Sequence, residues 1–245
     1  MQFDVIASDF SQFPTDKKHY IRLPMLKRMV GDVAGHTVLD LGCGDGYFTR
    51  YLKTWGAQTA VGIDISTALI DLARKQEVLL PQGVTYHVGD MRTARLCQQF
   101  DVVSSVYALN YSASKKDLHE ACLTIREHLK SKGRFVAIIP HPDILISNIF
   151  RYGNHVTSLS GRTTNLQDGE ILRCHHKKFD GTIYGFDFYY WSAQAYKNSI
   201  LAAGMEISYW LKPFVSEEGI QKYGKPYWDG YLASPSALGL VCRKR

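Results

Sequence analysis

Two hydrophobic periods alternate along residues 25–140, and this alternation predicts an α/β fold. Short apolar runs favour buried strands at 38–41, 60–63, 84–88, 100–106 and 134–139. Stretches with helical spacing lie around them, at 24–30, 47–55, 66–75 and 115–129. Strands that alternate with helices are typical of a parallel sheet covered by helices.

The regular pattern stops after Pro140. Residues 144–185 are rich in His, Asn, Gly and Thr and show no clear period. Such a segment is long for a plain connection inside a compact domain. We therefore expect one domain over residues 1–245, with a small lid lobe inserted at 141–191. Strand-like alternation at 183–191 belongs to this lobe, and a helix at 193–203 and strands at 206–210 and 238–242 complete the main sheet.

A glycine-rich turn follows the first strand, in the segment VLDLGCGDGYF at 38–48. Gly42, Gly44 and Gly46 let the backbone turn sharply and approach a ligand closely. The helix after them offers free N–H groups at its start. Dinucleotide-binding turns have the pattern GxGxxG, whereas this turn is GxGxG with Tyr47 where the last glycine would fall. The turn predicts a ligand cradle and argues against a nicotinamide dinucleotide.

Two carboxylates follow neighbouring strands. Asp64 ends the second strand, where its side chain can accept two hydrogen bonds from a ribose diol. Asp90 follows the third strand in the segment GDM, where a carboxylate and a backbone N–H can contact the edge of an adenine ring. Ligands of open α/β sheets lie beyond the carboxyl ends of the strands. The turn and the two carboxylates together predict a nucleoside site.

The motifs VLDLGCGDGYF, VGIDIS, VGDM and FDVVSSVYALNY resemble, in order, those of class I S-adenosylmethionine (SAM)-dependent methyltransferases. The resemblance implies a Rossmann-like seven-stranded sheet whose last strand is antiparallel, and SAM as the methyl donor that leaves as S-adenosylhomocysteine (SAH). HYIRLPML at 19–26 resembles the YxRP-type segment of small-molecule members, with Leu23 as an extra residue. The cofactor-binding residues that the resemblance implies are Tyr20, Arg22, Asp40, Gly42, Gly44, Asp64, Ile65, Asp90, Met91 and Val106.

The layout of the whole chain resembles the toxoflavin-pathway (azapteridine) N-methyltransferases and their relatives. This resemblance implies methyl transfer to an N or O atom of a small molecule, such as a heteroaromatic metabolite, and leaves the acceptor open. Tyr107, Asn110 and Tyr111 follow the fourth strand, where class I enzymes commonly contact the acceptor. His141 follows the fifth strand and is the candidate general base and a further acceptor contact. Methyl transfer from a sulfonium needs mainly alignment of the acceptor.

Composition and charge bear on which partners, cellular compartment and metals to expect. The net charge is +6, but basic residues are spread out, with Lys17-Lys18 among the tightest clusters, which argues against a nucleic-acid partner. No apolar run is long enough to span a membrane and no secretion signal is recognisable, so we expect a cytoplasmic monomer or homodimer. Five scattered cysteines without a CxxC pair argue against disulfides and zinc. His175 and His176 point to opposite sides of a strand, so no metal is expected.

Three other functions stay open. An RNA- or protein-directed methyltransferase is disfavoured because the fourth strand lacks a (D/N)PPY-type motif. A protein that binds SAM without catalysis is separable by isotope transfer from labelled SAM. A nicotinamide oxidoreductase predicts that NADH, and not SAH, raises the melting temperature, since a ligand of the native state stabilises it.

Overall fold

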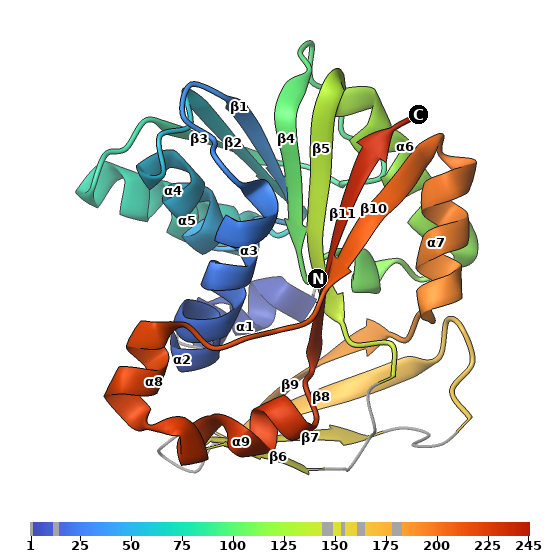
Figure 1. Cartoon of the computed structure of the whole chain (residues 1–245). Helices are drawn as coiled ribbons and strands as arrows, with labels where there is room; N and C mark the ends of the chain where they lie inside the picture. The colour runs from blue at the N-terminus through green and yellow to red at the C-terminus, as the bar shows by residue number, and fades with distance from the viewer. Residues whose placement is uncertain (1, 12–14, 144–148, 153–154, 161–164, 178–182) are drawn as a thin grey trace.

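The computed structural model describes residues 2–11, 15–143, 149–152, 155–160, 165–177 and 183–245. A seven-stranded sheet forms its centre, in the order β10-β11-β5-β4-β1-β2-β3 (Figure 1). β11 pairs antiparallel with β5 and β10, and the other neighbours pair parallel. This confirms the predicted sheet with its antiparallel last strand. The strands are β1 (Thr37–Leu41), β2 (Thr59–Asp64), β3 (Val84–Val88), β4 (Phe100–Val106), β5 (Leu129–Pro140), β10 (Met205–Leu211) and β11 (Ala237–Lys244).

Helices cover both faces of the sheet. One face carries α3 (Leu23–Val30), α4 (Tyr47–Thr54) and α5 (Thr67–Leu79), and the other carries α6 (Lys115–His128) and α7 (Ala193–Ala202). Successive strand side chains point to opposite faces, so Val38 packs in the cluster of α3 and α4, while Leu39 packs in that of α6 and α7. Ser66, the predicted N-cap of α5, accepts a hydrogen bond from the Leu69 N–H at 3.3 Å.

The N-terminal segment contains α1 (Gln2–Ser11), α2 (Thr15–Lys17) and a π-helical turn, η1 (Lys18–Arg22). From Thr15 on, α2 and η1 run directly into α3. The Leu23 N–H donates to the Lys18 carbonyl, which closes a turn one residue longer than an α-helical one. Pro24 lies in the first turn of α3 and has no N–H to donate, and the Tyr20 carbonyl four residues before it accepts a hydrogen bond from the Ser216 N–H at 2.8 Å instead.

A second, four-stranded sheet is inserted between β5 and α7. Its strands are β6 (Ile149–Tyr152), β7 (His155–Ser160), β8 (Ile171–Lys177) and β9 (Ile183–Tyr189), paired antiparallel in that order. Figure 1 shows it past the carboxyl ends of β4 and β5. β9 corresponds to the predicted strand at 183–191, and other parts of the predicted 141–191 lobe lie outside the described residues. A lid function for this sheet stays a prediction.

Three short helices complete the fold near the second sheet. They are η2 (Leu109–Tyr111), a 3₁₀ turn after β4, and α8 (Glu217–Tyr223) and α9 (Lys225–Ala233), which connect β10 to β11. Trp228 and Tyr231 of α9 are buried against α3 and β11. The five cysteines, all of them among the described residues, form no disulfide. Among the described residues, no helix combines the length and apolar character needed to cross a lipid bilayer.

Candidate active site

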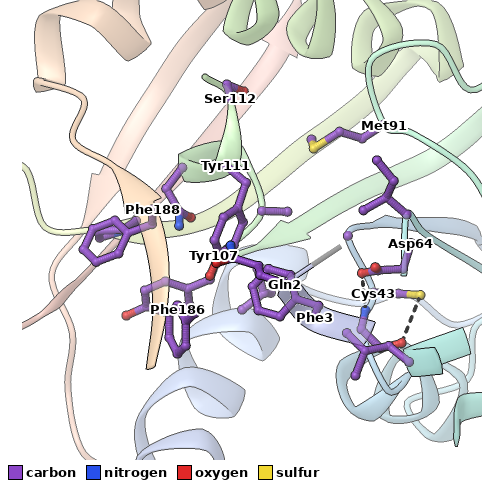
Figure 2. A pocket seen from close by; sticks show the side chains of 18 of the residues that line it. Gln2, Phe3, Cys43, Asp64, Met91, Tyr107, Tyr111, Ser112, Phe186 and Phe188 are labelled. Carbon is purple, nitrogen blue, oxygen red and sulfur yellow. Dashed lines mark hydrogen bonds between the residues drawn. The ribbon is translucent and has the colours of Figure 1, made fainter. Parts of the chain in front are cut away.

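A large cavity lies where the carboxyl ends of β1 to β4 face the second sheet and α1. Its volume is about 640 Å³, within the range of small-molecule sites. Figure 2 shows its two sides. Strand ends and the glycine turn form one side, which we call the cradle (Gly42, Gly44, Asp64 and 89–92). The opposite side, which we call the aromatic wall, consists of Tyr111, Phe186 and Phe188.

The glycine turn brings bare backbone to the cavity. Gly42, Gly44 and Gly46 have φ values of 74°, 57° and 75°, in the left-handed region that favours glycine. A Cβ atom at Gly42 would lie 2.2 Å from the Cβ of Ala108, so this position also excludes a side chain by contact. The Gly42 N–H donates to the Ile63 carbonyl at 2.7 Å, which fixes the turn against β2.

Asp64 joins the turn to the end of β2. Its Oδ2 accepts a hydrogen bond from the Gly44 N–H at 2.8 Å, and its Oδ1 accepts one from the Ser66 N–H at 2.9 Å. The side chain lines the cavity although the residue is only 9% exposed. Burial raises the pKa of Asp64, and the two backbone donors partly offset this. A carboxylate has about four acceptor positions, so roughly two stay available to a ligand.

Asp90 is held by an arginine that the sequence did not single out. Arg92 donates from Nε to both carboxylate oxygens of Asp90, at 3.0 and 2.9 Å, and from Nη1 to Asp117 at 2.7 Å. The hydrogen bonds from Arg92 lower the pKa of Asp90. The Asp90 carboxylate is therefore charged and largely engaged, and Gly89, Met91 and Arg92 line the cavity beside it.

Comparison with known proteins agrees with this geometry. Residues 38–133 match the family model described as "Methyltransferase domain". Magnesium-protoporphyrin O-methyltransferase of Rhodobacter capsulatus is 38% identical over 109 residues, which are 44% of this chain and 48% of that relative. The chain thus spans about half the length of the first relatives that it matches.

Solved structures share the whole fold. The CcbJ methyltransferase from Streptomyces caelestis has a TM-score of 0.73 over 98% of this chain and 96% of that chain, at 19% identity. CalS10, a SAM-bound amino pentose methyltransferase from Micromonospora echinaspora, has a TM-score of 0.59 over 100% and 92%, at 22% identity. Residues 38–133 are similar to a methyltransferase domain, and the chain has the Rossmann-like fold of SAM-dependent methyltransferases. The resemblance in the sequence motifs is confirmed at this level, and the closer likeness to azapteridine N-methyltransferases is not.

The cradle fits SAM. Gly42 and Gly44 present backbone without side chains to the cavity, and Asp64 keeps acceptor positions for a ribose diol. The structure brings most predicted site residues to this one cavity, although their individual contacts to SAM or acceptor stay predictions. Those that line it are Arg22, Gly42, Gly44, Asp64, Ile65, Asp90, Met91, Val106, Tyr107, Asn110 and Tyr111.

Tyr20 does not line the cavity, contrary to the placement expected for a residue near the SAM carboxylate. Its ring packs edge-on against Tyr223 and Trp228, at centroid distances of 5.7 and 6.2 Å. Its hydroxyl accepts a hydrogen bond from Lys222 Nζ at 3.1 Å. Residues four or five apart share a face of the wide η1 turn, so Lys18 and Arg22 both face the cavity. Tyr20 lies two residues from each of them and therefore points the opposite way.

Asp40 and His141 also lie outside the cavity wall. Asp40 is 1% exposed and accepts hydrogen bonds from the Thr49 and Ser104 hydroxyls at 2.7 and 2.8 Å, so it links β1 to α4 and β4. His141 lies in the loop after β5, where its Nδ1 accepts from the Asp143 N–H at 3.2 Å. Neither placement favours the predicted direct contact with SAM or with the acceptor.

The cavity has a roof that the sequence did not reveal, formed by α1. The Gln2 carboxamide donates to the Asp187 carbonyl and accepts from the Asp187 N–H, both at 2.9 Å. Asp4 accepts hydrogen bonds from the Ser66 hydroxyl at 2.7 Å and from the Ala68 N–H at 3.2 Å. α1 therefore bridges β9 and the start of α5. Phe3 of the same helix packs edge-on against Tyr111, at 4.9 Å.

Other cavity residues were also missed, namely Lys17, Lys18, Asp45 and Cys174. Asp45 lies within the glycine turn itself, whereas long-range packing brings Lys17, Lys18 and Cys174 to the cavity and nothing in the local sequence marks them. In the part of the chain that the structure describes, no group of three His, Cys, Asp or Glu side chains is placed to hold a metal ion.

Proposed function

We propose that the protein transfers the methyl group of SAM to a nitrogen or oxygen atom of a small molecule with a planar aromatic ring, in the class of heteroaromatic metabolites. One observation carries this proposal: the same cavity is lined by the cradle and by the aromatic wall. Aromatic side chains bind planar rings through stacked and edge-on contacts. A ring held by Tyr111, Phe186 and Phe188 lies across the cavity from the cradle.

The acceptor chemistry follows from Asn110. This residue is 2% exposed and lines the cavity, and its Oδ1 has no hydrogen-bond partner among the described residues. A buried carbonyl oxygen without a donor costs about 1–3 kcal/mol. An N–H or O–H group of the acceptor would supply the donor. We therefore favour an acceptor that carries a proton at or beside the methylated atom.

The names of similar proteins support a small acceptor. The Rhodobacter capsulatus relative is named for O-methylation of magnesium protoporphyrin, and CalS10 for an amino pentose. The chain layout resembles azapteridine N-methyltransferases, and the heteroaromatic acceptor that this resemblance implies would fit against the aromatic wall. The roof formed by α1 argues against an RNA or protein acceptor, because Gln2 and Asp4 tie it to both sides of the cavity.

Label transfer tests the proposal. The protein is incubated with SAM carrying a tritiated methyl group and with a cell extract, and label is counted separately in small molecules and in acid-precipitated RNA and protein. We expect label in the small-molecule fraction, its loss in Asp64→Ala, and its retention in Asp71→Ala, an exposed carboxylate of α5. Label in RNA or protein would support a macromolecular acceptor. Binding of SAH by calorimetry without any transfer would support a non-catalytic SAM-binding protein.

The setting of the activity is also a proposal. We place the protein in the cytoplasm as a monomer or homodimer, as the sequence indicates. Sedimentation of the purified protein with and without SAH tests the oligomeric state.

A further inference from the structure

Three cations share the side of the N-terminal segment that faces the cavity. Lys17, Lys18 and Arg22 all line it, because the wide η1 turn brings residues four and five apart to one face. Lys18 Nζ lies 3.5 Å from an Asp45 carboxylate oxygen, on the cradle side. The Arg22 guanidinium lies 4.4 Å from the centre of the Tyr107 ring.

Lys17 lines the cavity near the aromatic wall. Its Nζ lies 5.3 Å from the centre of the Tyr231 ring of α9, and Cys174 of β8 is an electrostatic neighbour. Cys174 packs in one cluster with Phe188 and Tyr111 of the aromatic wall. Lys17 is 5% exposed, so its amine is held inside the protein and not in bulk water.

The groups around Lys17 set its protonation. Burial, and then the Arg22 guanidinium, lower the pKa of Lys17 to about 7, while the Asp16 carboxylate acts in the opposite direction. The Asp16 carboxylate also accepts hydrogen bonds from the Tyr227 hydroxyl at 2.5 Å and from the Lys17 N–H at 2.9 Å. Burial raises the pKa of Cys174 to about 12, so its thiol is neutral. Near neutral pH a large fraction of the Lys17 amine is therefore uncharged and able to accept a proton.

We propose that Lys17 is the catalytic base that takes the proton of the acceptor N–H or O–H during methyl transfer. This inference rests on the proposed function. The acceptor lone pair forms a bond to the methyl carbon, and the carbon–sulfur bond breaks with its electron pair going to sulfur. The acceptor proton passes to the lone pair of Lys17 Nζ, which becomes an ammonium group. The ammonium loses this proton to water after the products leave.

Other titratable groups at the cavity are less suited to this role. Burial holds the pKa of Tyr111 well above its usual value, so it stays protonated. Lys18 is paired with Asp45, and an arginine such as Arg22 is not deprotonated in proteins. Asp90 is engaged by Arg92 in the cradle, on the cofactor side. His141, the base expected from the sequence, does not line the cavity.

A titration that needs no acceptor measures the proposed state directly. Lysine labelled with ¹³C at Cε is incorporated, and its resonances are followed against pH in the SAH complex. We expect one resonance with a midpoint near pH 7 that is absent from Lys17→Arg. A spectrum in which every lysine titrates near the ordinary value of about 10.4 overturns the proposal, and this result stands even if the variant folds poorly.

Kinetics with an acceptor found by label transfer tests the chemical role. At pH 7, Lys17→Arg and Lys17→Gln should each lower kcat by about 10²–10⁴-fold, and the rise of kcat through pH 7 should vanish. SAH affinity should stay within about 2-fold of wild type, well under the tenfold that 1.4 kcal/mol represents. Lys116→Arg, an exposed residue of α6, is the matched control with unchanged kcat.

The Lys17→Arg variant distinguishes a catalytic base from a cation that only binds the acceptor, because arginine keeps the charge and cannot take up a proton. If Lys17→Arg keeps the wild-type kcat, Lys17 binds an anionic group of the acceptor and the proposal is wrong. If the wild-type protein methylates no acceptor, the proposed function fails, while the lysine titration still reports whether residue 17 is an uncharged amine.

Discussion

The carboxylate of Asp64 accepts a hydrogen bond from the backbone N–H of Gly44 at 2.8 Å, across 20 residues of sequence. The glycine turn and the end of β2 are thereby held in one arrangement by the fold itself. A ligand that contacts both meets groups already in position, and this lowers the ordering cost of binding.

Removing that carboxylate should weaken cofactor binding. Asp64→Ala deletes a charged acceptor for the ribose diol and the clamp on Gly44. We expect SAH affinity to fall about 10–100-fold, since hydrogen bonds to charged groups contribute roughly 1.5–3 kcal/mol. Isothermal titration calorimetry measures the change, with Asp71→Ala as the control. Equal SAH affinities for Asp64→Ala and wild type would contradict the site.

Alanine substitutions at two glycines with similar backbone conformations distinguish the cost of a steric contact from the cost of backbone strain. Gly42 and Gly35 have φ values of 74° and 72°, but a Cβ at Gly42 meets Ala108 at 2.2 Å, whereas one at Gly35 meets nothing within 4 Å. Gly35→Ala should lower the free energy of unfolding by about 1–2 kcal/mol, and Gly42→Ala by roughly 2–5 kcal/mol. Urea denaturation measures both. Equal losses would show that the turn does not press against residue 108.

The orientation of the η1 turn predicts opposite results for two neighbouring residues. Arg22→Met removes a cation from the cavity wall and should weaken SAH binding about 10-fold or more, the loss of one charge-assisted contact. Tyr20→Phe removes a hydrogen bond to Lys222 and should cost about 0.5–1.5 kcal/mol of stability with little change in SAH affinity. Calorimetry and urea denaturation on both variants check this. A large loss of SAH affinity in Tyr20→Phe would restore the role first expected for that tyrosine.

Asp40 should make stability depend on pH. Burial raises its pKa from 3.8 to about 6, so the folded protein keeps a proton that the unfolded chain releases. Its contribution is therefore full below about pH 4 and is lost as pH rises to about 6, by roughly 3 kcal/mol. Unfolding free energies from pH 3.5 to 7 should show this decline in wild type. Asp40→Asn should flatten it, and an unchanged slope in the variant would assign the decline to other groups.

Local patterns were enough to predict the main sheet. Val38 to Leu41 and Phe100 to Val106 are short, mostly apolar runs that suit strands buried on both faces, and glycines mark the turn between β1 and α4. Asp64 and Asp90 could be placed because parallel strands carry their carboxyl ends to the same edge. These features depend on residues close in sequence, so they can be predicted without knowing the fold.

The missed features depend on distant contacts. The Gln2 side chain bonds only the main-chain N–H and carbonyl of Asp187, which every residue type except proline also has, so the sequence gives no sign of the roof. Lys17 belongs to a basic pair that suggests an ordinary solvated surface. Tyr20 was expected at the cavity from the likeness to the YxRP segment, but in the π-helical turn its ring packs against Tyr223 and Trp228.

The clasp between Gln2 and Asp187 joins residues 185 positions apart. During synthesis on the ribosome, the glycine turn and Asp64 emerge long before β9 exists. The floor of the cavity is thus translated early, whereas α1, the first of the described helices, must wait for about three quarters of the chain before it reaches its last partner. A ribosome stalled between β5 and β9 would carry a cofactor cradle open to the surrounding solution on the side that α1 and Asp187 later enclose.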